Sequence, residues 1–313
     1  MMKEKTAFIF PGQGSQSIEM GKDLYEKFPE AKTVFQEVDE ALHQNLSRLM
    51  FDGDIKELTQ TQNAQPAIMA VSMAGMRVLE ANGFSLKENT SFVAGHSLGE
   101  YTALCASGAL TLSQTACILQ VRGQAMAEAG KQESSGMMAI LGLASDLVQK
   151  IADDSGCYVA NDNGAGQWVL SGSLVTLSTA KMRAEESGAK RVIPLPVAGA
   201  FHSPLMRSAQ EKIKTVLEQI TFQRPDVPIV ANVTAKAETE NFTDLLKRQI
   251  ISPVRWRESI LYMQEQGITQ FVECGPGTVL SGLVRRIFPE SEQMHINDSD
   301  TVLAFLKAQE KNT

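Results

Sequence analysis

Short apolar runs alternate with longer amphipathic stretches along almost the whole chain of 313 residues. The run Thr6 to Phe10 predicts a buried strand, whereas Ala64 to Ala81 and Leu112 to Ala129 show the apolar spacing of helices. When strands and helices alternate in this way, helical crossovers join the strands into a largely parallel sheet. The sequence therefore predicts an α/β protein.

The order of predicted elements changes between residues 133 and 198. Two amphipathic stretches and four apolar runs follow one another there, and Asn163-Gly164 marks a hairpin turn between the middle runs. The predicted strands are Met137 to Leu141, Cys157 to Asn161, Gln167 to Ser171 and Arg191 to Leu195, and the helices are Ser145 to Asp154 and Leu174 to Ser187. This β-α-β-β-α-β order predicts a small ferredoxin-like domain at 133–198, inserted into a larger domain formed by 1–132 and 199–313.

The larger pattern resumes after the predicted insertion. We expect helices near Ser203 to Leu217 and Trp256 to Gln266, with strands at Val227 to Ala231 and Phe271 to Glu273. A Gly275-Pro276-Gly277 turn and two further helical stretches are expected to close the chain.

Composition excludes several classes of protein. Apolar residues make up 43% of the chain and charged residues 21%, as in soluble globular proteins, and the net charge of −7 argues against nucleic-acid binding. No apolar stretch reaches the length of a membrane span, and the four cysteines form no C-x-x-C pair. We expect a cytoplasmic protein whose partners include neither nucleic acid nor a membrane.

The segment Gly95-His96-Ser97-Leu98-Gly99 matches the pattern G-x-S-x-G. It follows the predicted strand Ser91 to Ala94 and precedes a predicted helix from Leu98 to Ser107, which is the setting of a nucleophile elbow. The flanking glycines allow a tight turn, and the following helix supplies backbone N–H groups for an oxyanion. Ser97 is therefore the candidate nucleophile.

A serine nucleophile needs a base, most often a histidine. Of the four histidines, His43 lies on the polar side of a predicted helix and His295 in a polar tail segment. The side chain of His96 is expected to point away from that of Ser97, since neighbouring side chains diverge in an elbow. His202 lies in a predicted loop between a strand and a helix, where catalytic groups of α/β folds collect, and is the candidate base.

Arg122 interrupts an apolar helix stripe. It falls three residues after Leu119 and four before Met126, on the face predicted to pack against the core. A charge there needs an anionic partner. The partner is either a carboxylate of the chain itself or a substrate carboxylate that the guanidinium holds with two hydrogen bonds.

The loop from Phe10 to Gln16 follows the first predicted strand and contains Gly12-Gln13-Gly14. It lacks the Gly and Lys spacing of phosphate-binding loops, so a nucleotide site is disfavoured. One of its backbone N–H groups can instead serve as a second oxyanion donor.

Taken together, these segments resemble the malonyl-CoA:acyl carrier protein transacylases of bacterial type II fatty acid synthesis and the acyltransferase domains of polyketide synthases. The similarity covers nearly the whole chain. The matching segments are Phe10 to Gln16, Gly95 to Glu100, Val121 to Gly123, Ala200 to Ser203 and Ser252 to Trp256. The resemblance implies an α/β hydrolase-like core with a mostly parallel sheet and an inserted ferredoxin-like subdomain.

The resemblance also implies roles for individual residues. Ser97 would be the nucleophile and His202 its base, with the main-chain carbonyl at Gln249 holding the histidine. The backbone N–H groups of Gln13 and Leu98 would form the oxyanion hole, and Arg122 would bind the malonyl carboxylate. A further two positions are implied at the pocket: Asn161 as a polar group, and Phe201, which together with Leu98 goes with malonyl rather than methylmalonyl selection.

The implied reaction transfers malonyl from malonyl-CoA to the phosphopantetheine thiol of acyl carrier protein through a malonyl-serine intermediate. A CoA thioester is the substrate, and no metal or bound cofactor is expected. Because CoA and the carrier protein are both anionic, a basic rim is expected around the site. The candidates are Lys190-Arg191 and Arg285-Arg286.

Two other functions remain open from the sequence. A serine thioesterase or esterase would place an acidic residue between the serine and the histidine, and Asp146, Asp153, Asp154 and Asp162 fall in that interval. A catalytically silent subunit that binds the carrier protein is the other alternative. The presence of candidate nucleophile, base and arginine together argues against silence.

Overall fold

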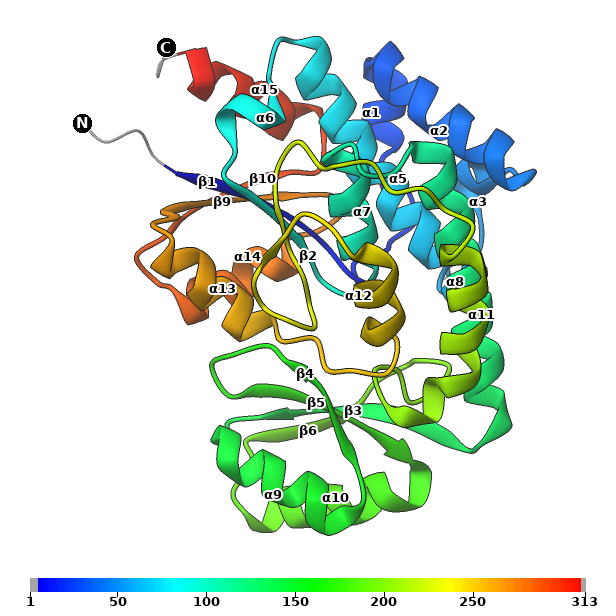
Figure 1. The fold of residues 1–313 in the computed structure, drawn as a ribbon, viewed down its shortest axis with the longest axis vertical. Coiled ribbons are helices and arrows are strands. Elements are labelled where there is room, and N and C mark those ends of the chain that lie inside the picture. Colours follow the sequence, from blue (N-terminus) through cyan, green and yellow to red (C-terminus); the bar gives the residue numbers. More distant parts are fainter. Residues whose placement is uncertain (1–4, 311–313) are drawn as a thin grey trace.

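The computed structural model describes residues 5–310 and contains two β-sheets (Figure 1). The strands of the large sheet are β1 (Thr6–Phe10), β2 (Phe92–Gly95), β7 (Ile229–Val230), β8 (Ala237–Glu238), β9 (Gln270–Cys274) and β10 (Glu292–Ile296). They lie in the order β10-β9-β1-β2-β7-β8, and all adjacent pairs except β7 and β8 are parallel. The prediction of a mostly parallel sheet is confirmed.

Helices surround the large sheet. Those that precede the small sheet in the chain are α1 (Lys22–Lys27), α2 (Pro29–Leu42), α3 (Leu46–Asp52), α4 (Ile55–Leu58), α5 (Thr61–Ala81), α6 (Leu86–Asn89), α7 (Leu98–Ala106) and α8 (Leu112–Gln132). Those that follow it are α11 (Arg207–Leu217), α12 (Phe242–Gln249), α13 (Trp256–Glu265), α14 (Val279–Ile287) and α15 (Ser299–Glu310), with a short 3₁₀ turn at Pro204–Met206. Within residues 5–310, no helix combines the length and the apolar content needed to cross a membrane.

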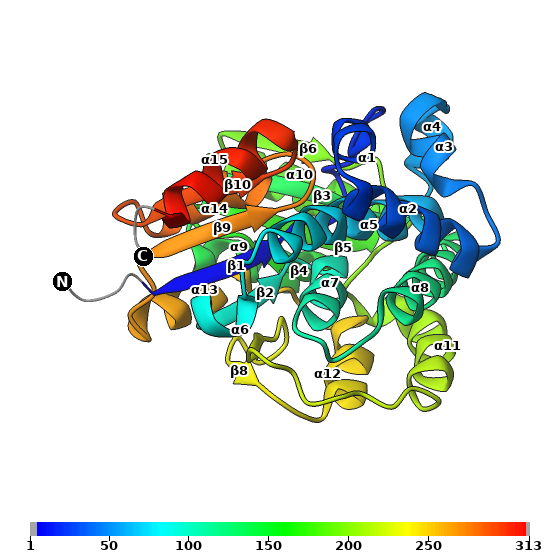
Figure 2. The same ribbon diagram turned by 90° about the horizontal axis from the view of Figure 1, so that it is seen from above.

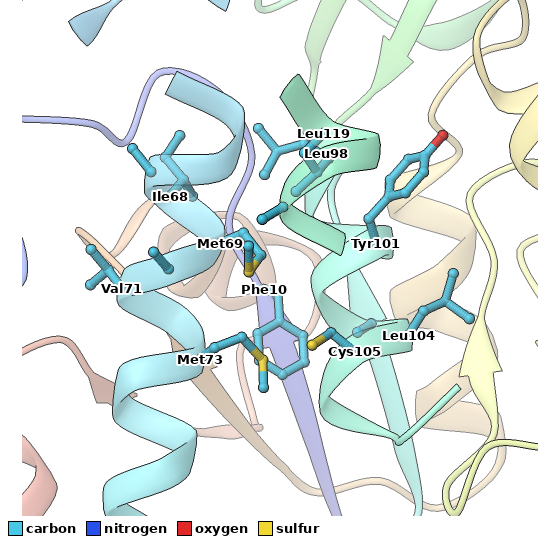
Figure 3. Close-up of a cluster of buried hydrophobic side chains, with 14 of the residues drawn as sticks. Phe10, Ile68, Met69, Val71, Met73, Leu98, Tyr101, Leu104, Cys105 and Leu119 are labelled. Atoms are coloured by element: carbon cyan, nitrogen blue, oxygen red, sulfur yellow. The ribbon is translucent and has the colours of Figure 1, made fainter. Parts of the chain in front are cut away.

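The alternation of side chains along β1 divides the core between the two faces of the large sheet. Phe8 and Phe10 belong to a cluster with α5 and α7, whereas Ala7 and Ile9 belong to a second cluster with α13 and α14. Helices α2, α5 and α8 lie side by side in the layer above the first face (Figure 2). In Figure 3, Phe10 lies between the methionines of α5 and the side chains of α7. β1 is therefore buried on both sides, as its continuous apolar sequence predicts.

The small sheet carries its helices on one face. Its elements are β3 (Ser135–Leu141), α9 (Ser145–Ser155), β4 (Tyr158–Asp162), β5 (Gln167–Ser173), α10 (Leu174–Glu186) and β6 (Arg191–Pro194). The strands are antiparallel in the order β4-β5-β3-β6, so the predicted β-α-β-β-α-β order is confirmed. Helices α9 and α10 cover the face turned away from the large sheet (Figure 1). The domain boundaries at 132/133 and 198/199 stay a prediction.

The other face of the small sheet turns toward the large domain. Met137, Ala139 and Val169 on this face belong to the main core cluster, whereas Met138, Ile140 and Leu170 pack under α9 and α10. Alternate side chains of the small sheet thus pack into two different hydrophobic cores, one shared with the large domain and one beneath α9 and α10. The inner face forms one wall of the cavity described below.

The two helical stretches predicted after Gly277 are α14 and α15, but the sequence analysis missed the strand between them. This strand, β10, pairs with β9 at the edge of the large sheet. β10 is mostly polar since an edge strand keeps one side in solvent, and His295 is exposed on that strand rather than in a tail. The predicted strand Val227 to Ala231 shortens to two residues in β7, and the short helix α12 was missed.

The start of α7 packs directly on the end of β1. A Cβ atom added at Gly99 would lie 2.2 Å from the carbonyl oxygen of Phe10, and one added at Gly95 would lie 1.9 Å from the backbone of Gly99. Neither site leaves room for a side chain, so both glycines of the G-x-S-x-G pattern are required by the close approach of two backbones.

We expect Gly99→Ala to lower the free energy of unfolding by about 2 kcal/mol or more, because the methyl group overlaps backbone that cannot rotate away. This corresponds to a fall of roughly 5 °C in the melting temperature, measured by circular dichroism. Gly282→Ala in α14 is the matched control, since its added Cβ meets no atom within 4 Å. It should melt at the same temperature as the parent protein or higher, and equal melting of Gly99→Ala would contradict the packing argument.

Candidate active site

Ser97 lies on the turn between β2 and α7 with φ of 54° and ψ of −106°, a backbone conformation that non-glycine residues rarely adopt. The N–H of Ser97 donates to Oδ1 of Asn232 at 2.9 Å, and Nδ2 of Asn232 donates to the carbonyl of Gly95 at 2.7 Å. The turn is therefore held from behind by a buried amide. This is the strand-turn-helix geometry of a nucleophile elbow, as the sequence predicted.

The elbow opens into a cavity of about 300 Å³ between the large sheet and the inner face of the small sheet. Its walls combine the loop after β1, the elbow, strands β3 and β5, the segment after β6 and the start of α14. The predicted site residues that line this cavity are Gln13, Ser97, Leu98, Arg122, Asn161, Phe201 and His202.

His202 reaches the serine from the segment between β6 and α11. Its Nε2 lies 2.8 Å from Oγ of Ser97, and its Nδ1 lies 2.9 Å from the carbonyl oxygen of Gln249. Since a carbonyl oxygen only accepts hydrogen bonds, Nδ1 carries the proton and Nε2 is left as an acceptor for the serine hydroxyl. The pair can therefore activate a nucleophile without a carboxylate.

The surroundings of His202 keep its imidazole neutral. The residue is almost fully buried, and this burial together with the nearby Arg122 charge lowers the pKa of His202 to about 3. At neutral pH the ring is therefore in the form that accepts a proton.

Arg122 is buried at the base of the cavity, with 1% of its surface exposed. One guanidinium nitrogen donates to Oε1 of Gln65 at 2.8 Å, and the other donates to Oε1 of Gln249 at 3.0 Å and to Oγ of Ser97 at 3.0 Å. The guanidinium also lies over the ring of Tyr101. Among residues 5–310 no Asp or Glu forms an ion pair with Arg122, so the alternative prediction of an ion pair within the chain is wrong. The positive charge of Arg122 therefore remains available to a bound anion.

Among the backbone N–H groups at the cavity that have no acceptor in the described part of the chain, two are those that the sequence predicted for an oxyanion hole. One belongs to Leu98 at the first position of α7, and the other to Gln13 in the loop after β1. A helix N-terminus carries a partial positive charge, which adds to the effect of the Leu98 donor. Together these donors can stabilise an oxyanion that develops next to Ser97.

Comparison with known proteins shows which family the chain belongs to. The acyl transferase domain family matches residues 7–308. The malonyl CoA-acyl carrier protein transacylase of Bacillus subtilis strain 168 is 44% identical over 98% of both chains. The crystal structure of acyl-carrier-protein-S-malonyltransferase from Bartonella henselae superposes with a TM-score of 0.95 at 43% identity, covering 97% of this chain and 99% of that one. The chain belongs to the malonyl CoA-acyl carrier protein transacylase family.

A further solved relative of this transacylase family was determined with a partner. It is a malonyl-transacylase in complex with a type II polyketide synthase acyl-carrier protein, with a TM-score of 0.93 and 36% identity over 97% of this chain and 99% of that one. The chain is therefore an acyltransferase, as the sequence resemblance implied.

The structure brings the predicted site residues of this transacylase together. Ser97, His202, Arg122 and Gln249 are directly hydrogen bonded to one another. Nδ2 of Asn161 lies 3.4 Å from Nε2 of His96 at the cavity wall.

The other three histidines do not contact the Ser97 side chain, as predicted. His43 and His295 are exposed, and His96 bonds Oδ1 of Asn163 at 2.9 Å rather than the serine. The aspartates that a thioesterase triad would use do not reach His202, whose Nδ1 faces a carbonyl. Asp162, for example, pairs with Arg257 at 2.8 Å.

Sequence reasoning missed three buried polar residues of the transacylase site, namely Gln65, Glu100 and Asn232. Gln65 lies in α5, where nearly every neighbouring side chain is buried, and a polar residue in such a helix is the signal that was available. Asn232 follows a two-residue strand, so no pattern marked it.

We predict that the acylation of Ser97 is nearly independent of pH between 7.5 and 5.5. An imidazole with an ordinary pKa of about 6.5 would lose roughly tenfold in its neutral form over this range, whereas a pKa of about 3 leaves His202 neutral throughout. Quenched-flow mass spectrometry of the first turnover with malonyl-CoA measures this rate directly. His202→Ala should be at least about a hundredfold slower at every pH, and a tenfold loss in the parent protein at pH 5.5 would contradict the lowered pKa.

Proposed function

We propose that this acyltransferase moves the malonyl group of malonyl-CoA onto the phosphopantetheine thiol of acyl carrier protein, in support of fatty acid synthesis. The observation that carries the proposal is the buried Arg122 charge, which lacks a carboxylate partner in the described chain and lies 3.0 Å from Oγ of Ser97. A malonyl ester on this serine carries its own carboxylate within reach of that charge. The names of the similar proteins support the same substrate and acceptor.

In the first half-reaction, Nε2 of His202 takes the proton of Ser97 while Oγ attacks the thioester carbonyl. The tetrahedral oxyanion accepts hydrogen bonds from the N–H groups of Leu98 and Gln13. Collapse of this intermediate breaks the carbon–sulfur bond, and the departing CoA thiolate takes the proton from His202. The malonyl group is then an ester of Ser97.

In the second half-reaction, the pantetheine thiol of the carrier protein gives its proton to His202 and attacks the ester carbonyl. A second oxyanion forms at the same donors, and its collapse breaks the bond to Oγ of Ser97, which recovers the proton. The reaction is ping-pong, since CoA leaves before the carrier protein reacts. These residues supply both the proton transfers and the charge stabilisation, so we propose that no metal or bound cofactor takes part.

The neutral partners of Arg122 suit a site for a substrate carboxylate. Gln65 and Gln249 fix both ends of the guanidinium through amide oxygens without cancelling its charge. A planar guanidinium fixed in this way can hold a carboxylate with two hydrogen bonds. We therefore propose that Arg122 selects acyl groups that end in a carboxylate.

We also propose that the carrier protein and CoA meet a basic rim at one end of the small sheet. Arg286 of α14 donates to Oε1 of Gln167 at 3.0 Å, and Gln167 lines the cavity. Across the strands, Gln167 lies opposite Leu141, which in turn lies opposite Arg191. The exposed cations of this rim are Lys190, Arg191, Arg285 and Arg286. They would attract anionic partners to a protein of net negative charge.

A cytoplasmic location fits this function. All four cysteines are free thiols, as expected in a reducing compartment. Localisation of a fluorescent fusion in intact cells would check this part of the proposal.

Intact-protein mass spectrometry tests the proposed function. After mixing with malonyl-CoA, the protein should gain the mass of one malonyl group on Ser97, and addition of carrier protein bearing its phosphopantetheine arm should move that mass to the carrier. Ser97→Ala should gain no mass. An adduct that decays to malonate at the same rate with or without carrier would point to a thioesterase, and the absence of any adduct would point to a silent binding subunit.

We expect Arg122→Ala to lower kcat/KM for malonyl-CoA by about a hundredfold or more, because the substrate carboxylate would be buried without its cation. Slow transfer of acetyl groups or hydrolysis should remain, since the Ser97 and His202 pair is retained. Arg183→Ala is the matched control, because that arginine forms an exposed ion pair with Asp154 on the far side of the small sheet. Unchanged malonyl kinetics in Arg122→Ala would rule out the carboxylate site.

A further inference from the structure

Glu100 is a buried acidic residue that the mechanism above does not use. It lies in the first turn of α7 with 1% of its surface exposed, three residues after Ser97. Within the described chain it forms no ion pair, and its Oε1 has no hydrogen-bond partner. Burying an unpaired carboxyl group costs free energy. The contacts of its other oxygen, Oε2, explain why the group lies here.

The other carboxylate oxygen accepts hydrogen bonds from two residues of the active site. Oε2 of Glu100 accepts hydrogen bonds from Nε2 of Gln249 at 2.8 Å and from the backbone N–H of Asn232 at 3.0 Å. Burial raises the pKa of Glu100 to about 7, against the opposing effects of these two donors and of Arg122. Oε2 can accept in either protonation state, so the contacts do not depend on the charge.

These two partners are the residues that hold the reacting groups. Asn232 bonds the backbone of the strained Ser97 turn, whereas Gln249 bonds Arg122 through its side chain and His202 through its carbonyl. Through Asn232 or Gln249, Oε2 of Glu100 is therefore linked by hydrogen bonds to Ser97, His202 and Arg122.

Glu100 also helps to fix which way the Gln249 amide faces. Nε2 of Gln249 has three acceptors, of which Oε2 of Glu100 is the nearest at 2.8 Å, followed by the carbonyl of Ser97 at 3.0 Å and Oδ1 of Asn232 at 3.4 Å. If the amide rotated by half a turn, its oxygen would face the oxygens of Ser97 and Asn232 and its nitrogen would face the guanidinium of Arg122, so the hydrogen bonds to Ser97 and Arg122 would be lost. The acceptors on one side thus present Oε1 of Gln249 to Arg122 on the other.

We propose that Glu100 is a positioning residue of the transacylase site, which acts through Gln249 to hold the Arg122 guanidinium in place for the substrate carboxylate. This inference rests on the proposed function, since it concerns the same acyl-binding site. Removing the acceptor at Glu100 takes away the shortest hydrogen bond of the Gln249 Nε2 group and thereby loosens the contact of Gln249 with Arg122. The loss should therefore be greater for malonyl-CoA, whose carboxylate needs Arg122, than for acetyl-CoA, which has none.

Two substitutions separate the acceptor from the charge. Glu100→Gln keeps an acceptor oxygen for both donors and removes only the charge, so its kcat/KM for malonyl-CoA should stay within about threefold of the parent value. Glu100→Leu removes the acceptor, and we expect kcat/KM for malonyl-CoA to fall at least tenfold while the preference for malonyl over acetyl falls at least fivefold.

Thr102→Val is the matched control. Thr102 is fully buried in the same helix, and its hydroxyl has no partner in the described chain, so this near-isosteric change should leave both kinetics and discrimination unchanged. If Glu100→Leu does not fold, as judged by circular dichroism, Glu100→Asp takes its place. The shorter side chain keeps the charge but withdraws the oxygen from both donors, and it should show the same loss of discrimination.

The loading of Ser97 by malonyl-CoA is measured first in the parent protein. Its absence would overturn the proposed function itself. Suppose instead that the parent protein loads normally, and that folded Glu100→Leu or Glu100→Asp loses kcat/KM equally for malonyl-CoA and acetyl-CoA. This result would show that Glu100 does not act through Arg122. A loss in Glu100→Gln as large as in Glu100→Leu would also overturn the proposal, because the acceptor oxygen is retained there.

Discussion

The buried guanidinium of Arg122 is the charge around which the cavity is organised. It lies beneath the serine, and amide oxygens and an aromatic ring surround it instead of a carboxylate from residues 5–310. A cation buried in this way is unfavourable until an anion arrives, and this is the physical basis of the proposed preference for an acidic acyl group. The same charge helps to keep His202 neutral, so the proposed substrate site and the proposed base share one electrostatic arrangement.

The second constraint is the tight turn at Ser97. A residue with positive φ at this position persists only when its neighbours hold it, and here the support comes from Gly95, Gly99 and Asn232. The close approach of α7 to β1 aims the helix N-terminus at the cavity and leaves the Leu98 N–H without an internal acceptor. The strained turn and the unpaired N–H of Leu98 thus lie at the same backbone contact.

Several parts of the chain that are distant in sequence supply the walls of the site. Gln249 at the end of α12 joins the histidine to the arginine, although it lies 127 residues from Arg122 along the chain. The small sheet contributes its inner face, so the cavity exists only because the inserted segment folds back over the elbow (Figure 1). The cavity is thereby enclosed between two separate sheets.

The sequence by itself determined the elements that local pattern specifies. Apolar periodicity located the buried strand β1, the long helices α5 and α8 and the β-α-β-β-α-β order, and the G-x-S-x-G pattern located the elbow. It also placed Arg122 on a buried helix face, but it left open what that charge contacts. Edge strand β10, short helix α12 and the roles of Gln65, Glu100 and Asn232 were not predicted, because polar edges and single buried amides have no periodicity.

Only the tertiary structure decided how these side chains meet. It showed that a carbonyl rather than an aspartate faces His202, and that the partners of Arg122 are neutral, since both depend on contacts between residues far apart in the chain. Local sequence determines where a helix or turn forms because its interactions lie within a few residues. Which charges are compensated is decided by the packing of distant elements, and that packing sets the chemistry of the site.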